Sequence, residues 1–255
     1  MPQKLNLYKN FIKLLDNKIF FNFFQLTYQR YLIYKSKKFL TNYSNFEIYP
    51  KKYHNDPFSV LCEKYGTDKG GSNSKLNERD VHFYSCFYNN FFKDKKDQIK
   101  LILECGIGTT DETISANMSK LGNPGASLRV LREYFLNAKI YGADIDKNIL
   151  FTSDRISTYY VDQLDSFSIN SMWENINEDN FDLIIDDGMH SLHAAYNFFS
   201  LSFKKLKKNG IYIIEDVHIS YMVQLAKKLK EFNPKIISSS KKNNIDDYLF
   251  LIRKY

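Results

Sequence analysis

The feature of the sequence that most constrains its fold is the segment 181–193, FDLIIDDGMHSLH. It begins with an apolar run interrupted only by Asp182 and ends with two carboxylates, a glycine and two histidines. A short apolar run bounded by polar residues predicts a strand buried on both faces, as in a parallel sheet. Ligands of open α/β sheets bind beyond the carboxyl ends of the strands. We therefore expect the chemistry of the protein at the end of this segment.

A second apolar run, 210–214, ends in Glu215 and Asp216, and strand and helix patterns alternate from residue 99 onward. Such alternation predicts a doubly wound α/β fold. No helix fits between the last two strands, so we expect them to form an antiparallel hairpin. The prediction is a seven-stranded, mostly parallel, Rossmann-like sheet with a terminal antiparallel hairpin. The expected strands are 100–105, 139–143, 158–161, 181–185, 210–214, 235–239 and 248–252, and the expected helices between them are 126–135, 166–175, 190–206 and 220–232.

The N-terminal part of the chain differs from the rest in charge and pattern. Residues 1–60 carry ten Lys/Arg and three Asp/Glu, which accounts for the whole net charge of +7. Apolar residues recur about every four positions in 1–40, which predicts one or two amphipathic helices. We place a helical, aromatic and basic extension at 1–56 and a catalytic domain at 57–255. The extension would cover the core, form a homo-oligomer interface or make a peripheral membrane contact, and the sequence leaves these alternatives open.

Cysteine usage and hydropathy bear on the compartment. The three cysteines are odd in number and form no CxxC pair, which favours reduced thiols. The longest uncharged run near the N-terminus, 19–29, has 11 residues, whereas a membrane-spanning helix needs about 20. We expect a cytoplasmic protein, with peripheral contact at the inner face of the membrane left open.

Three consecutive strand ends carry groups that suit an adenosine-containing cofactor. The first strand–helix turn, ECGIG, contains Gly106 and Gly108, where the backbone can approach a ligand closely. Asp144 ends the second strand and can hold the two hydroxyls of a ribose. Asp162 and Gln163 follow the third strand and could meet the edge of an adenine. The three strand ends together predict a nucleoside-containing cofactor.

The motifs ECGIG, GADID, VDQ, FDLIIDDGMH and GIYIIEDV resemble, as a set, those of class I S-adenosylmethionine-dependent methyltransferases. More narrowly, they resemble the metal-dependent sugar O-methyltransferases of the macrocin and mycinamicin type. The resemblance covers about residues 64–217. It implies methyl transfer from S-adenosyl-L-methionine to a sugar hydroxyl with the help of a divalent metal, Mg or Mn. The implied acceptor is a sugar-containing small molecule or glycan, such as a sugar nucleotide or a precursor of a surface or capsular polysaccharide.

The resemblance also implies roles for individual residues. His190, three residues after Asp187, matches the family's catalytic base, and Asp187, Glu215 and Asp216 match its metal ligands. The loop KYGTDKGG, 64–71, resembles a family loop near the cofactor and substrate. The residues expected to bind the cofactor are Lys64, Thr67, Glu104, Gly106, Gly108, Ser127, Asp144, Asp162, Gln163 and Asp186. Asp186 is also expected to orient a neighbour or to contact backbone.

The chain departs from compact members of that family after the glycine loop. About 16 residues, 109–124, intervene before the helix that begins near Ser127. The insert leaves the contacts of Thr109, Thr110 and Ser127 open. It suits a lid or a wall of the acceptor site.

Physical chemistry agrees with these roles. Adjacent parallel strands lie about 4.8 Å apart, so carboxylates on neighbouring strand ends can share one cation, which removes their mutual repulsion. Oxygen ligands suit Mg²⁺ or Mn²⁺. Such an ion lowers the pKa of a hydroxyl, and His190 could take the proton. Glu215 and Asp216 could instead cap the following helix, and His193 and His218 are expected to be structural.

Three other functions stay open at this point. The basic N-terminal segment allows a nucleic-acid (RNA) methyltransferase, although the charge lies outside the acid-bearing domain, so no nucleic-acid partner is expected. An NAD-dependent oxidoreductase is disfavoured by the terminal hairpin and by Asp111 at the position of the third fingerprint glycine. A non-catalytic subunit is disfavoured because every expected site residue is present.

Overall fold

The computed structural model of the chain describes residues 18–49, 55–70, 82–118, 120, 122–239, 245 and 247–255. It divides into two compact units, Met1–Ser44 and Asn45–Tyr255. The first unit contains α2 (Lys18–Thr41), a helix with five Lys/Arg and no Asp/Glu. Residues 1–17 of the predicted extension lie outside the described part. Within the described residues, no helix has the length and apolar character needed to cross a membrane.

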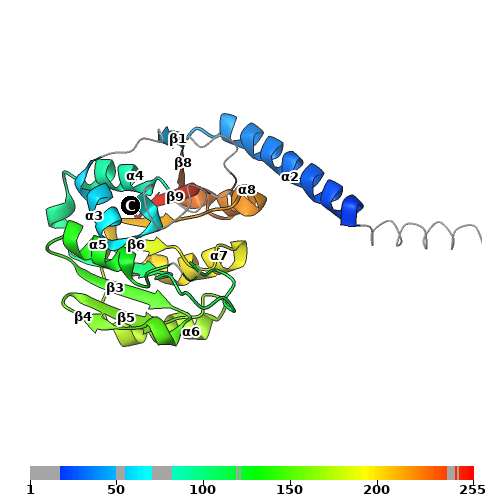
Figure 1. Ribbon diagram of the computed structural model, residues 1–255. Helices are drawn as coiled ribbons and strands as arrows, with labels where there is room; N and C mark the ends of the chain where they lie inside the picture. Colours follow the sequence, from blue (N-terminus) through cyan, green and yellow to red (C-terminus); the bar gives the residue numbers. More distant parts are fainter. Residues whose placement is uncertain are drawn as a thin grey trace, which may run out of the picture. The chain divides into compact units, whose positions relative to one another are not determined.

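The second unit is built on a nine-stranded sheet in the order β1-β8-β9-β7-β6-β2-β3-β5-β4 (Figure 1). The five central strands β7, β6, β2, β3 and β5 are parallel, and β9 runs antiparallel to both β7 and β8. The predicted doubly wound sheet with its terminal hairpin is therefore confirmed. The strands are β1 (Phe46–Tyr49), β2 (Leu101–Cys105), β3 (Lys139–Asp144), β4 (Thr152–Ser153), β5 (Ile156–Tyr160), β6 (Phe181–Asp186), β7 (Leu206–Ile214), β8 (Lys235–Ser239) and β9 (Tyr248–Arg253).

Two strands were not predicted, and they occupy the two edges of the sheet. β1 has four residues and pairs in parallel with β8, while β4 has two exposed residues and pairs with β5. Runs this short carry too little periodicity to be recognised in a sequence. Because β1 lies within 1–56, the sheet takes a strand from the segment predicted as an extension. The domain boundary at 56/57 stays a prediction.

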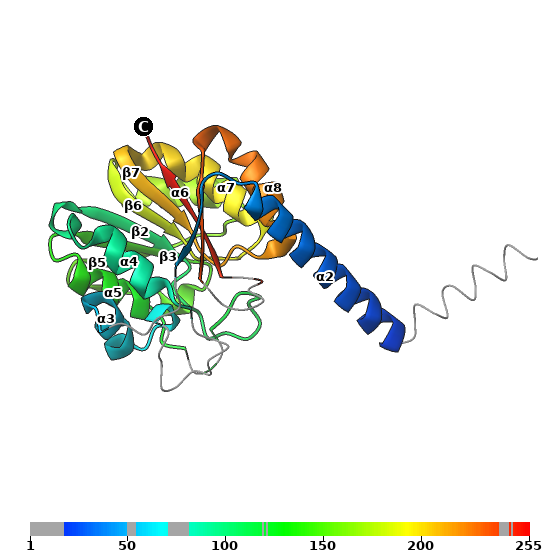
Figure 2. The ribbon, with the colours of Figure 1, turned by 90° about the horizontal axis from the view of Figure 1, so that it is seen from above.

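Helices cover both faces of the sheet. Figure 2 shows α3, α4 and α5 on one face and α6, α7 and α8 on the other. The helix α4 begins at Tyr84, and His82 lies two residues before it. The helices are α3 (Pro57–Tyr65), α4 (Tyr84–Phe92), α5 (Ala126–Tyr134), α6 (Ser166–Ile176), α7 (Leu192–Ser202) and α8 (Ile219–Lys228), with 3₁₀ turns η1 (Asp68–Gly70), η2 (Lys96–Gln98), η3 (Lys147–Ile149), η4 (Phe203–Lys205) and η5 (Lys230–Phe232).

An aromatic cluster holds α3, α4 and α5 together on their face of the sheet. Phe58 of α3 stacks on Tyr88 of α4 with ring centroids 5.1 Å apart, and it meets the edge of Tyr134 of α5 at 4.9 Å. Phe58 and Tyr88 are fully buried. Such ring pairs stabilise by about 0.5–1.5 kcal/mol beyond the area they bury. The packing fixes α4 so that its buried Tyr88 hydroxyl reaches the carboxyl end of β7.

Candidate active site

A cavity of about 820 Å³ lies at the carboxyl ends of the parallel strands. Each of the five central strands contributes to its wall through the residues that follow it: Gly106 after β2, Asp144 at the end of β3, Gln163 after β5, Asp187 after β6 and Asp216 after β7. Ligand cavities of proteins commonly measure about 300–1,000 Å³. This cavity is therefore large enough for a nucleoside cofactor and part of a second molecule.

The glycine loop after β2 brings the backbone close to the end of β6. Gly106 has φ 85°, and a Cβ there would lie 2.0 Å from the carbonyl oxygen of Asp187. Its amide donates to the carbonyl of Ala143 at 2.8 Å, which ties the loop to β3. A side chain at Gly106 would need both a left-handed backbone and a shift of Asp187. Gly106 therefore allows the glycine loop to lie close to Asp187 at the carboxyl end of β6.

The insert 109–124 forms part of the cavity wall. Its residues from Thr113 to Met118, and Asn123, line the cavity. The Thr109 hydroxyl donates to Asp146 at 2.6 Å, and the Met118 amide donates to the Thr109 carbonyl at 2.8 Å. These bonds fold the insert back over the glycine loop. Ser127, the first-turn residue of α5, donates instead to Glu104 at 2.6 Å.

Asp144 is held in place by the backbone around it. Its carboxylate accepts from the amides of Ile107 at 2.8 Å and Asp146 at 2.9 Å. It is 6 % exposed, and burial raises its pKa. Each carboxylate oxygen has two lone pairs, so the side chain keeps acceptor capacity toward the cavity. Asp144 can therefore accept hydrogen bonds from two ribose hydroxyls.

Asp186 acts through Gln163 and is absent from the cavity wall. The Gln163 amide nitrogen donates to Asp186 at 2.6 Å, and the Gln163 amide oxygen accepts from the Met189 amide at 2.7 Å. Burial raises the pKa of Asp186 to about 7. The side-chain amide of Gln163 is thus already oriented by its neighbours. This arrangement agrees with the expectation that Asp186 orients another residue.

The segment after α3 delivers a lysine to the acidic strand ends. Gly66 caps the C-terminus of α3 in the left-handed conformation, and η1 follows. At Gly70 a Cβ would lie 2.6 Å from the Cβ of Cys62, so only glycine lets η1 pack so closely on α3. The result is that Lys69 is 4 % exposed.

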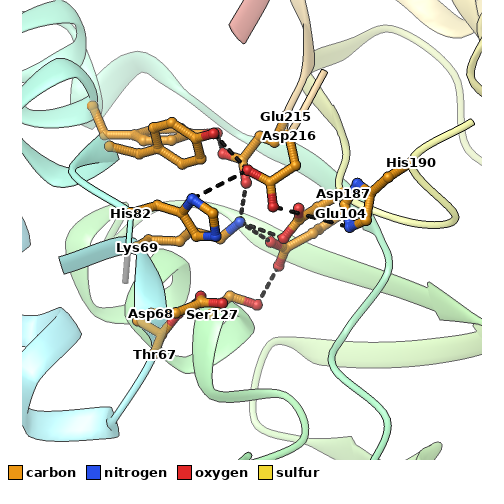
Figure 3. A network of polar contacts seen from close by, with 12 residues as sticks. Thr67, Asp68, Lys69, His82, Glu104, Ser127, Asp187, His190, Glu215 and Asp216 are labelled. Carbon is orange, nitrogen blue, oxygen red and sulfur yellow. Dashed lines mark hydrogen bonds and ion pairs between the residues drawn. The ribbon is translucent and has the colours of Figure 1, made fainter. Parts of the chain in front are cut away.

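The Lys69 ammonium is the centre of an acidic cluster (Figure 3). Its Nζ lies 2.6 Å from Oδ2 of Asp187 and 3.3 Å from Oε1 of Glu104, and it also contacts Oε2 of Glu215. Burial lowers the pKa of Lys69, but the three carboxylates raise it more, so the pKa lies well above its ordinary value. Tyr88 donates to the other oxygen of Glu215. Lys69 therefore stays charged and counters part of the negative charge.

Asp216 has its own set of partners. The Tyr84 hydroxyl donates to Asp216, and His82 Nδ1 lies 3.4 Å from Asp216 and 2.6 Å from the fully buried Asp247. Burial lowers the pKa of His82, but Asp216 and Asp247 bring it to about 10. Although burial raises the pKa of Asp216, the two histidines nearby hold it below its ordinary value. Asp216 is therefore ionised over the physiological range.

His190 reaches the cavity from the loop between β6 and α7. Its Nε2 lies 4.0 Å from Oδ2 of Asp216, and its side chain is 32 % exposed. Both His190 and Asp216 have left-handed backbones, with φ 51° and 50°. Such conformations cost on the order of 1–2 kcal/mol for residues other than glycine, and they concentrate at functional sites. His193 is exposed on α7, and His218 caps α8 by accepting from the Ser220 amide.

The described residues include a group that fits a divalent cation. One ligand atom each from Asp187, His190 and Asp216 lies within 4.8 Å of the others. Carboxylate oxygens are the preferred ligands of Mg²⁺ and Mn²⁺. Oε1 of Glu104 is buried and lies 3.3 Å from the Lys69 ammonium, which it shares with Asp187 and Glu215. In a second group, His82 already forms ion pairs with Asp216 and Asp247, so these carboxylates have a cation without a metal.

The structure gathers most of the predicted site residues at one cavity. The wall contains His190, Asp187 and Asp216 and the predicted cofactor residues Thr67, Gly106, Gly108, Ser127, Asp144, Asp162 and Gln163. Lys64 lies outside the wall and pairs with Glu133 at 2.8 Å, while Glu104, Asp186 and Glu215 lie behind it. The alternative in which Glu215 and Asp216 cap α8 is wrong, because His218 caps it. The individual roles stay predictions.

Sequence reasoning did not single out Lys69, His82, Tyr84 or Tyr88. Lys69 stands in the motif KYGTDKGG beside Lys64, and nothing local distinguishes the two lysines. The signal that could have identified them is the number of carboxylates expected at buried strand ends. Several carboxylates at buried strand ends need a cation or hydroxyl donors nearby, and the segments 64–71 and 82–88 offer both.

The sequence resembles curated sugar O-methyltransferases, while no family model matches it. It is 31% identical over 167 residues to the L-olivosyl-oleandolide 3-O-methyltransferase of Streptomyces antibioticus, covering 65% of this chain and 38% of that one. It is 30% identical over 164 residues to the mycinamicin VI 2''-O-methyltransferase of Micromonospora griseorubida, covering 64% and 36%. The chain thus spans less than two-fifths of the length of the curated relatives it matches.

A solved structure shares the fold. The MycE methyltransferase from the mycinamycin biosynthetic pathway, in complex with Mg and SAH, aligns with a TM-score of 0.59 and 23% identity over 79% of this chain and 56% of that one. A second MycE structure, with Mg, SAH and mycinamycin VI, aligns with a TM-score of 0.57. The chain is therefore similar in sequence to sugar O-methyltransferases and shares its fold with the MycE methyltransferase.

Proposed function

We propose that the protein is a metal-dependent O-methyltransferase that transfers the methyl group of S-adenosyl-L-methionine to a sugar hydroxyl. The observation that carries the proposal is the grouping of Asp187, His190 and Asp216 at the wall of the cavity that also reaches Gly106 and Asp144. The sequence relatives are named as O-methyltransferases of glycosylated molecules. They lend no support to the nucleic-acid methyltransferase or the NAD-dependent oxidoreductase.

The cofactor would occupy the part of the cavity nearest β2, β3 and β5. Gly106 and Gly108 allow close approach of the backbone, Asp144 accepts from the ribose, and Asp162 and Gln163 border the adenine side. The residues of the insert from Thr113 to Met118 line the cavity and would help exclude water from the sulfonium centre.

The acidic end of the cavity would activate the acceptor. Asp187 and Asp216 would hold a divalent metal, which when bound acts as a Lewis acid toward a hydroxyl. His190 takes the proton of the hydroxyl that is methylated. The hydroxyl oxygen then forms a bond to the methyl carbon while the carbon–sulfur bond breaks, and S-adenosylhomocysteine leaves. The electron pair of that bond stays on sulfur, so the charges balance.

The finer assignments are part of the proposal. The metal is Mg²⁺ or Mn²⁺, because carboxylate ligands suit both ions. The acceptor is a sugar nucleotide or a sugar within a precursor of a surface or capsular polysaccharide. Glu215 is a metal ligand if Lys69 releases it. Peripheral contact with a membrane is supported by the five basic residues of α2, since anionic headgroups attract such a helix. Homo-oligomerisation stays a prediction.

Transfer of labelled methyl from S-adenosyl-L-methionine to a panel of acceptors tests the proposal. The panel holds sugar nucleotides, glycosylated small molecules and an RNA, each with Mg²⁺, with Mn²⁺ and with excess chelator. We expect transfer to at least one sugar acceptor, loss of transfer in chelator and no transfer to RNA.

The variant Asp187→Asn serves as the inactive enzyme, and Asp179→Asn is its matched control. Asp179 is 67 % exposed and pairs with Lys205 away from the cavity. Full transfer in chelator would remove the metal from the proposal, and transfer to RNA alone would replace the sugar acceptor.

A further inference from the structure

Lys69 and a divalent metal would need the same carboxylate. Oδ2 of Asp187 lies 2.6 Å from the Lys69 ammonium, and Asp187 also belongs to the group that fits a metal. A carboxylate that holds a buried ammonium binds a second cation less strongly, because the two positive charges repel each other at short distance. The two partners of Asp187 are therefore in competition.

Lys69 is built firmly into this position. It is 4 % exposed, its backbone lies in η1, and the contact between Gly70 and Cys62 presses η1 against α3. Figure 3 shows its side chain directed at Glu104, Asp187 and Glu215. Three carboxyl groups face one ammonium through one oxygen each, so a further cation can still contact their other oxygens. Lys69 thus weakens the attraction for a metal without abolishing it.

We propose that Lys69 is a resident cation that keeps the acidic cluster folded before a divalent metal binds and lowers the metal affinity by competing for Asp187 and Glu215. The inference rests on the proposed metal-dependent function and deepens it. It makes Lys69 a positioning residue, because it acts on the metal ligands rather than on substrate.

The opposite role is physically distinct. If Lys69 only aligned Asp187 and Glu215 for the metal, its removal would loosen the ligands and weaken binding. The sign of the change in metal affinity therefore separates competition from alignment.

The test is Mn²⁺ binding, measured by isothermal titration and by the electron paramagnetic resonance signal of free Mn²⁺. Lys69→Met removes the charge, Lys69→Gln removes it but can still donate to a carboxylate, and Lys69→Arg keeps it. The matched control is Lys205→Met, since Lys205 is a half-buried lysine that pairs with Asp179 at 2.7 Å outside the cavity. We expect at least a tenfold lower Kd for Mn²⁺ in Lys69→Met and Lys69→Gln, and a wild-type Kd in Lys69→Arg and Lys205→Met.

Thermal unfolding gives a second readout that needs no activity. In chelator, Lys69→Met and Lys69→Gln should have a lower Tm than the wild type, because buried carboxylates lose their counter-ion. Saturating Mn²⁺ should raise their Tm by more than it raises that of the wild type. If Lys69→Met does not fold in chelator, Mn²⁺ binding and thermal unfolding are both measured on Lys69→Gln.

The outcomes separate the two proposals. Equal or weaker Mn²⁺ binding by both neutral variants, with clear binding by the wild type, would overturn the competition and leave the metal site standing. Mn²⁺ binding by Lys69→Met and Lys69→Gln but not by the wild type would support the competition. No Mn²⁺ binding by any variant or by the wild type would overturn both the competition and the metal role in the proposed function.

Discussion

Tyr84 and Tyr88 lie one turn apart on α4 and donate hydrogen bonds to the adjacent carboxylates Asp216 and Glu215. Burial, together with these carboxylates, raises the pKa of both hydroxyls well above the ordinary value, so both stay protonated as donors. Glu215 is 1 % exposed, whereas the side chain of Asp216 is 17 % exposed.

Removal of the Tyr88 hydroxyl should therefore cost more than removal of the Tyr84 hydroxyl. Tyr88→Phe leaves one oxygen of a buried carboxylate without its donor, and we expect a loss of about 1–3 kcal/mol in the free energy of unfolding. Tyr84→Phe should lose less, since water reaches Asp216. Urea unfolding measured in chelator checks both values. A larger loss for Tyr84→Phe would contradict the burial argument.

Asp187→Asn and Asp216→Asn should each lower methyl transfer by at least about 100-fold, because even residues that only support metal ligands change metal affinity by 10–100-fold. Both substitutions keep the side-chain volume and remove one charge. Initial rates at a Mg²⁺ concentration that just saturates the wild type measure the effect, with Asp179→Asn as the control. Activity that survives in both variants would place the metal elsewhere.

His190→Asn should lower kcat by about 10²–10⁴-fold, which is the range for loss of a general base. The pH–rate profile should also lose its acidic limb, because a protonated base cannot accept the hydroxyl proton. His193→Asn is the matched control, since His193 is exposed on the neighbouring α7. A profile that keeps its shape in His190→Asn would assign the proton to another group.

His82 should stabilise the protein in a pH-dependent way. Its pKa in the folded protein is about 10, above the ordinary 6.5, because Asp216 and Asp247 outweigh the effect of burial. The stabilisation is therefore fully present below pH 6.5 and is lost as the pH rises through 10. In chelator, the difference in unfolding free energy between the wild type and His82→Gln should shrink over that range. A constant difference, or an imidazole pKa near 6.5 by NMR, would contradict the ion pairs.

Gly106→Ala should destabilise the protein and weaken binding of S-adenosylhomocysteine. The new Cβ would sit 2.0 Å from the Asp187 carbonyl, and alanine at φ 85° is strained by about 1–3 kcal/mol. Thermal unfolding with and without S-adenosylhomocysteine measures both effects. Unchanged Tm and unchanged binding would mean that the loop moves freely away from β6.

The central strands and their acidic ends could be predicted because their signals are local. The run 181–185 is apolar except for Asp182, and two acids follow it within the same ten residues. The same holds for 210–216. A buried parallel strand and the acids at its carboxyl end are therefore close together in the sequence. Because the strands are parallel, their carboxyl ends meet at one edge of the sheet.

The cations of the site could not be predicted in this way. Lys69 meets Asp187 and Glu215 across 118 and 146 positions of sequence, and His82 meets Asp247 across 165. No periodicity links residues so far apart. Their pairing depends on the packing of Phe58 on Tyr88 and of η1 on α3, which places segments 57–70 and 82–92 over the sheet end.

The aromatic cluster that packs α3 against α4 also limits which segments of the protein can be exchanged with those of a homologue. A chimera that takes the parallel strands from β2 onward out of this chain would keep Glu104 and Glu215 but inherit foreign neighbours in place of Lys69 and Tyr88. Buried carboxylates deprived of matching donors oppose folding. Exchanges between homologues should therefore move 57–92 and the central strands as one block.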